Sequence, residues 1–272
     1  MTSAQRQVGD LLRAWRQRRR MSQLDLACEA DISTRHLSFL ETGRAQPSRD
    51  MVVLLAERLD VPLRDRNQLL VAAGYAPLYP ERSLDDPALA AARRAVELVL
   101  AGHEPYPAIA IDRHWHLVAA NGAIGPLLAG AAPDLLRPPV NVLRLSLHPA
   151  GIAPRIENLP EWRGHLLGRL RRQVEISGDP GLEKLLAELE VYPVADGSRR
   201  AEAARGHDHA PIAVPLRFRT EAGTLSFLST TMVFGTPVDV TLSELAVESF
   251  FPADQATAEA LRGSAHRCKA MS

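Results

Sequence analysis

The chain has 272 residues, of which 46% are hydrophobic and 24% charged, and its 32 basic and 32 acidic residues leave no net charge. This length favours about two domains, and the apolar content is enough to build a core in each. No apolar run approaches the roughly 18 residues of a membrane span, the start does not resemble a signal peptide, and two cysteines exclude a disulfide framework. We therefore expect a cytoplasmic protein without membrane contact.

The first 76 residues show the periodicity of short amphipathic helices. Val8, Leu11, Leu12 and Trp15 lie on one face of a first helix. Ser22 can cap a second helix, and Asp25 occupies the acidic position of a capping box. The turn that follows is expected at residues 31–33.

A third helix is predicted from Thr34 to Thr42, capped by Ser33 and ended by Gly43, which readily adopts a positive φ. Pro47 and Ser48 begin a fourth helix, and a fifth covers about residues 65–73 before Gly74. These elements predict a compact five-helix unit.

The strings S-Q-x-x-L-A (Ser22–Ala27) and I-S-x-x-x-L-S-x-x-E-x-G-R-x-x-P-S (Ile32–Ser48) resemble the lambda-repressor and Cro type of helix-turn-helix, the XRE family. The resemblance implies that residues 1–76 bind double-stranded operator DNA. It places Gln23 on a phosphate, where it also braces the reading helix, and directs Thr34, Arg35 and Ser38 to base edges. The full set of implied DNA-binding residues is Gln23, Ser33, Thr34, Arg35, Ser38, Arg44 and Arg49, of which the last two are phosphate contacts.

Charge gives only modest support to this interpretation. Residues 1–76 hold 12 arginines and nine acidic residues, whereas the remainder is slightly acidic. So small an excess predicts weak binding by one protomer, and hence a homodimer that reads two half-sites. Arginine makes up 30 of the 32 basic residues, so Arg13, Arg16 and residues 18–20 are as readily solvated side chains as DNA contacts.

A linker is expected at residues 77–86, where prolines and polar residues interrupt the helical pattern. After it, a helix is predicted from Pro87 to about Leu100. A hairpin of strands 107–112 and 115–120 follows, and then helical segments at 124–128, 141–147, 158–177 and 180–189. Asn158 and Glu161 read as a capping box, and residues 195–210 as a polar loop.

Strands at 212–220, 224–234 and about 242–251 complete an antiparallel five-stranded sheet, which we expect to carry helices on one face. The predicted fold is therefore α+β, an all-α lambda-repressor-like unit followed by a domain whose element order resembles a PAS-like sensor.

Four strings sharpen this second resemblance: Asn141–Pro149, Asn158–Arg163, Glu188–Pro193 and Glu244–Asp254. They resemble the MmyB-like ligand-binding domain, here assigned to residues 87–262, with a tail at 263–272. The resemblance implies a bacterial transcription regulator whose PAS-like domain accepts a small apolar ligand such as a fatty acid.

The residues of this segment can supply an apolar pocket with a few polar groups. Expected lining side chains are Leu143, Leu145, Leu147, Trp162, Leu166, Leu167, Phe227 and Met232. For a ligand carboxylate, the candidates are Asn121, Arg144, His148, Asn158 and Trp162. Capping, turn and core roles are open alternatives for most of these polar residues.

No catalytic, cofactor or metal site is expected. The chain lacks the usual nucleophile, phosphate-loop, dinucleotide and zinc-protease motifs. His207 and His209 lack a third ligand at usable spacing, and His114 and His116 read as a surface pair on one face of a hairpin. Two alternatives to sensing stay open: a carboxy-terminal domain that serves dimerisation or protein docking without a ligand, and an enzyme with an attached DNA-binding head.

Overall fold

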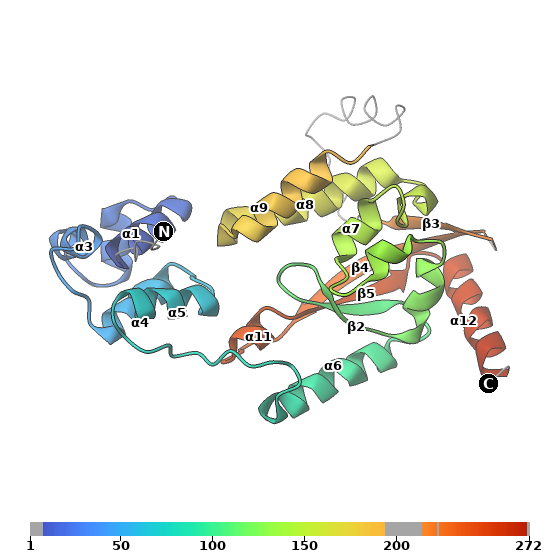
Figure 1. Cartoon of the computed structure of the whole chain (residues 1–272), viewed down its shortest axis with the longest axis horizontal. Helices are drawn as coiled ribbons and strands as arrows, with labels where there is room; N and C mark the ends of the chain where they lie inside the picture. The colour runs from blue at the N-terminus through green and yellow to red at the C-terminus, as the bar shows by residue number, and fades with distance from the viewer. Residues whose placement is uncertain (1–7, 194–213, 222, 271–272) are drawn as a thin grey trace. The chain divides into compact units, whose positions relative to one another are not determined.

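The computed structural model describes residues 8–193, 214–221 and 223–270. Contacts within the chain divide it into two compact units. The first contains the described residues up to Ser83 together with Glu175–Gly178 and Thr236–Ser243, and the second contains the other described residues. Figure 1 shows a helical unit and a second unit built on a sheet.

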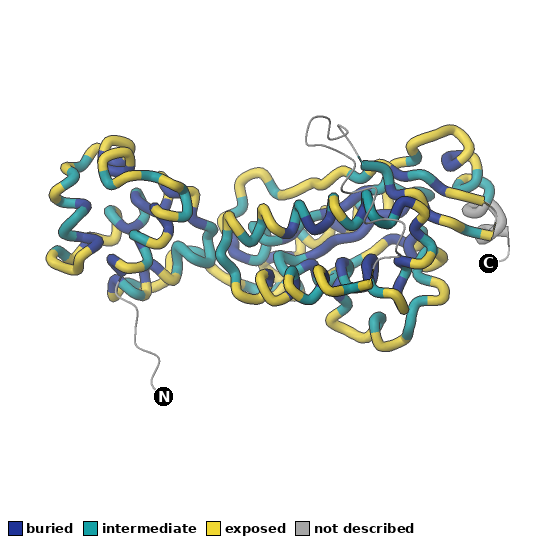
Figure 2. The backbone as a smooth tube through the Cα atoms, turned by 90° about the horizontal axis from the view of Figure 1, so that it is seen from above, coloured by how far each residue is buried: buried dark blue, intermediate teal, exposed yellow. Residues whose placement is uncertain are grey.

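The helical unit consists of α1 (Val8–Arg18), α2 (Gln23–Glu29), α3 (Thr34–Glu41), α4 (Arg49–Arg58) and α5 (Leu63–Ala72). The predicted caps are confirmed, because the side-chain oxygens of Ser22, Ser33 and Ser48 each accept a backbone N–H of the following helix. Gly43 and Gly74 have positive φ angles of 71° and 86°, as their positions after α3 and α5 predict. Buried residues at helical spacing form its core, seen as alternating dark and light segments in Figure 2.

One close approach fixes how α1 meets α3. A Cβ atom added to Gly9 would lie 2.4 Å from the carbonyl oxygen of Leu40, closer than any real side chain tolerates. Only glycine at this position lets the two helices approach as they do.

The second unit contains a five-stranded antiparallel sheet in the order β2-β1-β5-β4-β3. Its strands are β1 (Ala108–Ile111), β2 (Leu117–Ala120), β3 (Leu216–Thr220), β4 (Gly223–Val233) and β5 (Ala246–Pro252). Its helices of six or more residues are α6 (Ala90–Gly102), α7 (Val142–Leu147), α8 (Leu159–Ser177), α9 (Pro180–Glu190) and α12 (Gln255–Ala270). Short helical turns η1 (Pro87–Leu89), η2 (Gly122–Leu128), η3 (Pro133–Leu136) and η4 (Ala153–Arg155) complete its described elements, whereas the turn α11 (Val240–Ser243) is grouped with the helical unit.

Apolar residues pack on both faces of this sheet. Successive strand residues point to opposite faces, and Ile109 and Ile111 join the large cluster formed with α7, α8 and α9. Ala108 and Ala110 instead pack with Val96 and Leu100 of α6. The expectation of helices on only one face is therefore wrong, since α6 covers part of the other.

Three further details differ from the predicted elements. The last strand begins at Ala246 rather than near Leu242, because residues 240–243 form the turn of α11. α12 continues to Ala270, beyond the boundary at 262 drawn from the sequence. The polar loop expected at 195–210, with His207 and His209, lies outside the described residues.

None of the described helices is both long and apolar enough to cross a membrane.

Candidate functional sites

α3 presents a polar face and buries an apolar one. Leu37 and Leu40 are fully buried in the helical core, whereas Arg35 is exposed and Thr34 and Ser38 are partly exposed on the other side of the helix. Ser33, just before the helix, accepts the backbone N–H of His36 at 3.1 Å. The amino-terminal half of α3 thus offers short hydroxyl side chains and one guanidinium to a binding partner.

Phe39 organises the arginines on this face. The guanidinium carbons of Arg35 and Arg44 lie 5.3 and 5.9 Å from the centre of its ring, within the range of cation–π attraction. Phe39 is partly exposed rather than part of the core. Arg49 is the exposed first residue of α4, directly after the cap Ser48.

The far end of α3 is held by a buried carboxylate. Glu41 is 2% exposed and accepts hydrogen bonds from Arg16 Nε and Nη2 at 2.6 and 2.9 Å. Gln23 Nε2, at the start of α2, donates to the same carboxylate at 2.8 Å. Gln23 therefore contacts α3 through Glu41. Arg16, which the sequence left open as a DNA contact, is buried and engaged in the core instead.

The charge state of Glu41 follows from these bonds. Burial alone would raise the pKa of Glu41, but the hydrogen bonds from Arg16 and Gln23 and the positive charges of Arg16 and Arg13 outweigh it and lower that pKa. The carboxylate is therefore ionised at neutral pH.

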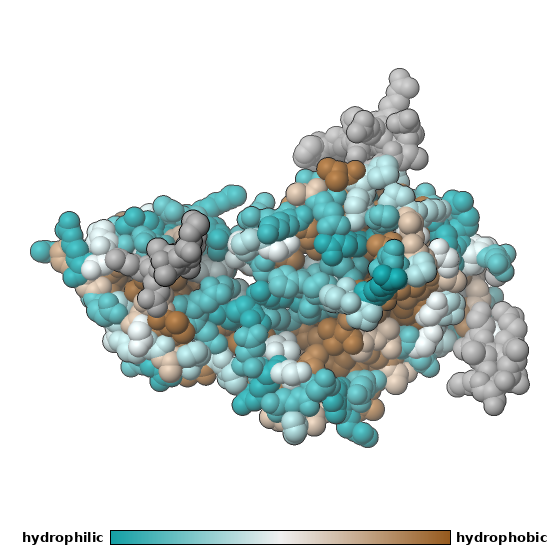
Figure 3. All heavy atoms as spheres, in the orientation of Figure 1, coloured by the Kyte–Doolittle hydropathy of each residue, from teal (hydrophilic) through white to brown (hydrophobic). Residues whose placement is uncertain are grey.

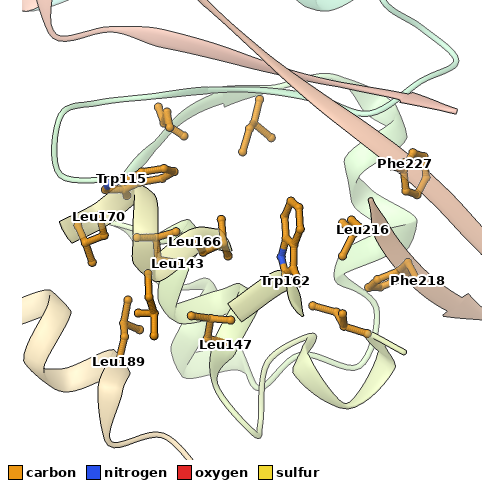
Figure 4. Close-up of a cluster of buried hydrophobic side chains, with 14 of the residues drawn as sticks. Trp115, Leu143, Leu147, Trp162, Leu166, Leu170, Leu189, Leu216, Phe218 and Phe227 are labelled. Atoms are coloured by element: carbon orange, nitrogen blue, oxygen red, sulfur yellow. The ribbon is translucent and has the colours of Figure 1, made fainter. Parts of the chain in front are cut away.

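The interior of the second unit is largely apolar. Figure 4 shows Trp162 among the leucines of α7 and α8 and near Phe218 and Phe227 of the sheet. Most of the expected lining residues lie in this cluster. Met232 does not line it, because that side chain is 47% exposed on β4.

A polar pair interrupts this apolar interior. Arg169 of α8 donates hydrogen bonds to Glu248 of β5 and to Thr231 of β4, and its guanidinium lies 4.8 Å from the centre of the Trp115 ring. Glu248 is buried, whereas Arg169 keeps partial contact with solvent and Thr231 is exposed. Burial, and then the charge of Arg169, lower the pKa of nearby His165. An ionic pair at the edge of an apolar core is a place where an acidic head group can be held.

This pair was missed at the level of sequence. Glu248 lies in the string Glu244–Asp254, in a strand between the apolar residues Val247 and Phe250. A charged residue at an inward-facing strand position was the available signal.

Three of the predicted ligand residues have structural partners. Asn121 donates to the carbonyls of Leu100 and Tyr106 and accepts the N–H of Ala108. Asn158 Nδ2 donates to Glu161 Oε2 at 3.3 Å, but the two do not form the predicted capping box, because the Asn158 oxygen accepts Arg217 N–H and Nδ2 also donates to Pro215 O. Trp162 Nε1 donates to Ser146 Oγ at 3.1 Å.

Arg144 and His148 lie together on α7 and its end, beside α9. Arg144 makes two hydrogen bonds to Glu188, at 2.8 and 2.7 Å, and Tyr192 donates to Glu188 at 2.6 Å. The His148 ring packs edge-on against Tyr192. Burial and the bond to Glu188 raise the pKa of Tyr192 to about 12.

Known proteins resemble this chain in both units. Residues 12–65 match the helix-turn-helix family, and residues 92–263 match the MmyB-like transcription regulator ligand binding domain. A relative from Methanoculleus marisnigri, provisionally described as an HTH-type transcriptional regulatory protein, is 35% identical over 116 residues. That match covers 41% of this chain and 37% of the relative, so the chain spans well under half of the relative's length.

The two family matches agree with the two units of the fold. The first covers the helix-turn-helix and its exposed α3 face, and the second contains the whole sheet with its apolar interior. The second family is described as that of transcription regulators. The chain therefore belongs to the MmyB-like transcription regulators, in which a helix-turn-helix is followed by a ligand-binding domain.

Proposed function

We propose that the protein is a cytoplasmic one-component regulator that reads operator DNA as a homodimer and senses an acidic apolar ligand, such as a fatty acid. α3 would read the DNA, and the interior of the second unit would hold the ligand. The observation that carries the ligand assignment is the Arg169–Glu248 pair at the edge of the large apolar cluster.

The surface of α3 supports the proposed DNA contacts. Arg35 is exposed near the start of the helix, as is required of a side chain that enters the major groove. A guanidinium can bond guanine O6 and N7 together, which is worth about 1 to 3 kcal/mol of discrimination. Arg44 and Arg49 are exposed and would contact phosphates, and Gln23 would both brace α3 and bond a phosphate.

Selection from random DNA, followed by a footprint of the enriched site, tests this reading. Arg35→Ala should relax sequence preference, whereas Gln23→Ala should weaken binding to all sequences alike. Arg58→Ala is the matched control, because Arg58 is an exposed arginine in the last turn of α4. If Arg35→Ala keeps the parent's sequence preference, α3 is docked wrongly.

The ligand proposal rests on the Arg169 guanidinium. An incoming carboxylate would share this group with Glu248, while the acyl chain packs against side chains of the apolar cluster. The partial exposure of Arg169 and Thr231 gives the head group a route from solvent. Arg144 is a weaker candidate, since its pair with Glu188 is more exposed, with the two side chains 41% and 36% exposed.

Binding of a long-chain fatty acid to delipidated full-length protein provides the test, with calorimetry as readout. Arg169→Gln should weaken binding at least tenfold, as loss of a charge-assisted bond predicts. Arg171→Gln is the control, since Arg171 lies on the same helix but pairs on the surface with Glu190. Equal affinity in the two variants would place the head group elsewhere.

A docking module is the alternative function for the second unit. Leu228 and Phe251 are paired across β4 and β5, and both are more than a third exposed. Figure 3 shows apolar areas among hydrophilic ones on the visible face of this unit. If protein purified under mild conditions releases no lipid on extraction and binds none afterwards, docking becomes the favoured reading.

A further inference from the structure

The hairpin between β1 and β2 gathers groups that neither DNA reading nor fatty-acid binding uses. Asp112, His114 and His116 each offer one ligand atom, and these three atoms lie within 4.8 Å of one another. All three side chains are partly exposed, so an ion can reach them from solvent. We propose that this hairpin is a binding site for a divalent transition-metal ion of the zinc type.

The backbone of the hairpin is built to hold these side chains in place. Asp112 Oδ1 accepts the backbone N–H groups of both His114 and His116, each at 2.8 Å. Trp115, between the two histidines, has a φ of 65°. This left-handed residue reverses the chain, and its buried indole donates to Gln173 Oε1 at 2.8 Å. The two histidines thus lie on either side of Trp115, whose position is fixed by burial and by this hydrogen bond.

The donor atoms suit a borderline metal. Asp112 Oδ2 lies 3.0 Å from His116 Nδ1, and two ligands of a tetrahedral zinc, at bonds of about 2.0 to 2.1 Å, lie about 3.3 Å apart. The three ligand atoms lie within 4.8 Å of one another, so their widest separation exceeds this value by at most about 1.5 Å. Two imidazoles and a carboxylate, with water in the fourth position, form a familiar zinc set.

Asp179 completes the arrangement as an orienting group. His114 Nε2 lies 3.0 Å from Asp179 Oδ2, so we assign Nδ1 of His114 as the metal ligand. A carboxylate on the second ring nitrogen fixes the tautomer and raises the basicity of a histidine ligand. The positive charge of Arg113 would repel a cation, but Arg113 forms ion pairs with Asp179 and Glu244, at 3.2 and 3.6 Å.

Because Asp179 caps α9, a bound ion would tie the β1–β2 hairpin to that helix. Zinc should therefore raise the melting temperature of the full-length protein, since a ligand that binds only the folded state stabilises it.

The test is titration of chelator-treated full-length protein with Zn²⁺ in competition with a fluorescent zinc indicator. We expect one strong site in the parent and affinity at least tenfold weaker in His116→Ala and Asp112→Asn. The asparagine retains an oxygen that can accept the two backbone N–H bonds. The matched control changes the other H-x-H pair, His207→Ala with His209→Ala, and should keep the parent's affinity.

The proposal is overturned if the parent has no strong site, if the control loses it, or if His116→Ala retains it. Should the hairpin variants fail to fold, histidine protection in the parent locates the site. Chemical modification of histidines, mapped by peptide mass spectrometry, should show that Zn²⁺ protects His114 and His116. Protection at other histidines only would equally overturn the assignment.

Discussion

Arg16 and Glu41 form a two-pronged ion pair that joins α1 to the end of α3, and both side chains are buried. The pair fixes how α3 is presented at the point where its polar face ends. Gln23 adds a third bond to the same carboxylate. The orientation of α3 therefore depends on a charge that is buried inside the helical unit.

Glu41→Gln should destabilise the helical unit by about 3 to 5 kcal/mol, because it leaves the Arg16 guanidinium buried without its counter-charge. Hydrogen exchange at the amides of α1 and α3 measures the loss. Glu29→Gln is the control, since Glu29 is exposed at the end of α2. Equal protection in the two variants would show that the ion pair contributes nothing to stability.

The same carboxylate predicts an acid-sensitive step. Folding lowers the pKa of Glu41, so the native state binds fewer protons than the unfolded state near that pKa. The stabilisation is fully present above the unfolded pKa of about 4.3 and is lost as pH falls through the folded pKa. Denaturant titrations of the helical unit at successive pH values should show this loss in the parent and a flatter profile in Glu41→Gln.

Gly9→Ala should also destabilise the helical unit, although alanine favours helices. Its methyl group would meet the backbone of Leu40 and Glu41, and overpacking of this kind costs about 1 to 3 kcal/mol. Gly164→Ala in α8 is the counterpart, because a Cβ there meets nothing within 4 Å. It should be stabilising by up to about 1 kcal/mol. Thermal unfolding of both variants separates crowding from helix propensity.

Tyr192 should ionise well above the usual pKa of a tyrosine. Burial and its hydrogen bond to Glu188 raise its pKa to about 12, so removal of the carboxylate charge should lower that value. Glu188→Gln is expected to bring the pKa only partway back, because the burial remains. Titration of the tyrosine ring carbons by NMR gives both values, and an unchanged pKa in the variant would contradict the assigned role of Glu188.

The exposed sheet face offers a test of the proposed homodimer. Leu228, Met232 and Phe251 lie on the same face as the α6 contacts, since Met232 pairs with Val247 and Leu228 with Phe251. A charge in the middle of this face, as in Met232→Glu, should shift a dimer toward monomer in sedimentation experiments. Val191→Glu places the same charge at an exposed apolar residue after α9. A dimer that survives Met232→Glu must use another surface.

Local signals in the sequence predicted the helical unit closely. Caps at Ser22 and Ser33 and the glycine after α3 are read from one or two neighbouring residues, and the structure confirms them. The antiparallel sheet was likewise predictable from alternating strands and turns. The start of β5 was placed wrongly because residues 240–243 carry apolar residues that suit a strand as well as a helical turn.

Polar residues with distant partners were the part that the sequence did not reveal. Glu248 and Arg169 are 79 positions apart, and Asn158 and Arg217 are 59 apart. No spacing rule links such residues, so Asn158 resembled a local cap and Arg169 one solvated arginine among many. The same limit made His114 and His116 read as a surface pair, since Asp179 lies 65 positions beyond His114.

Asn121 joins three stretches of backbone in the second unit, near the end of α6, before β1 and at its first residue. Any shift of Leu100 must be shared by Ala108 or break a bond of a buried amide, which is costly. A displacement of the end of α6 is therefore expected to move the start of β1 with it. A displacement of β1 would likewise be transmitted to the end of α6 through these hydrogen bonds, in addition to the apolar contacts between them.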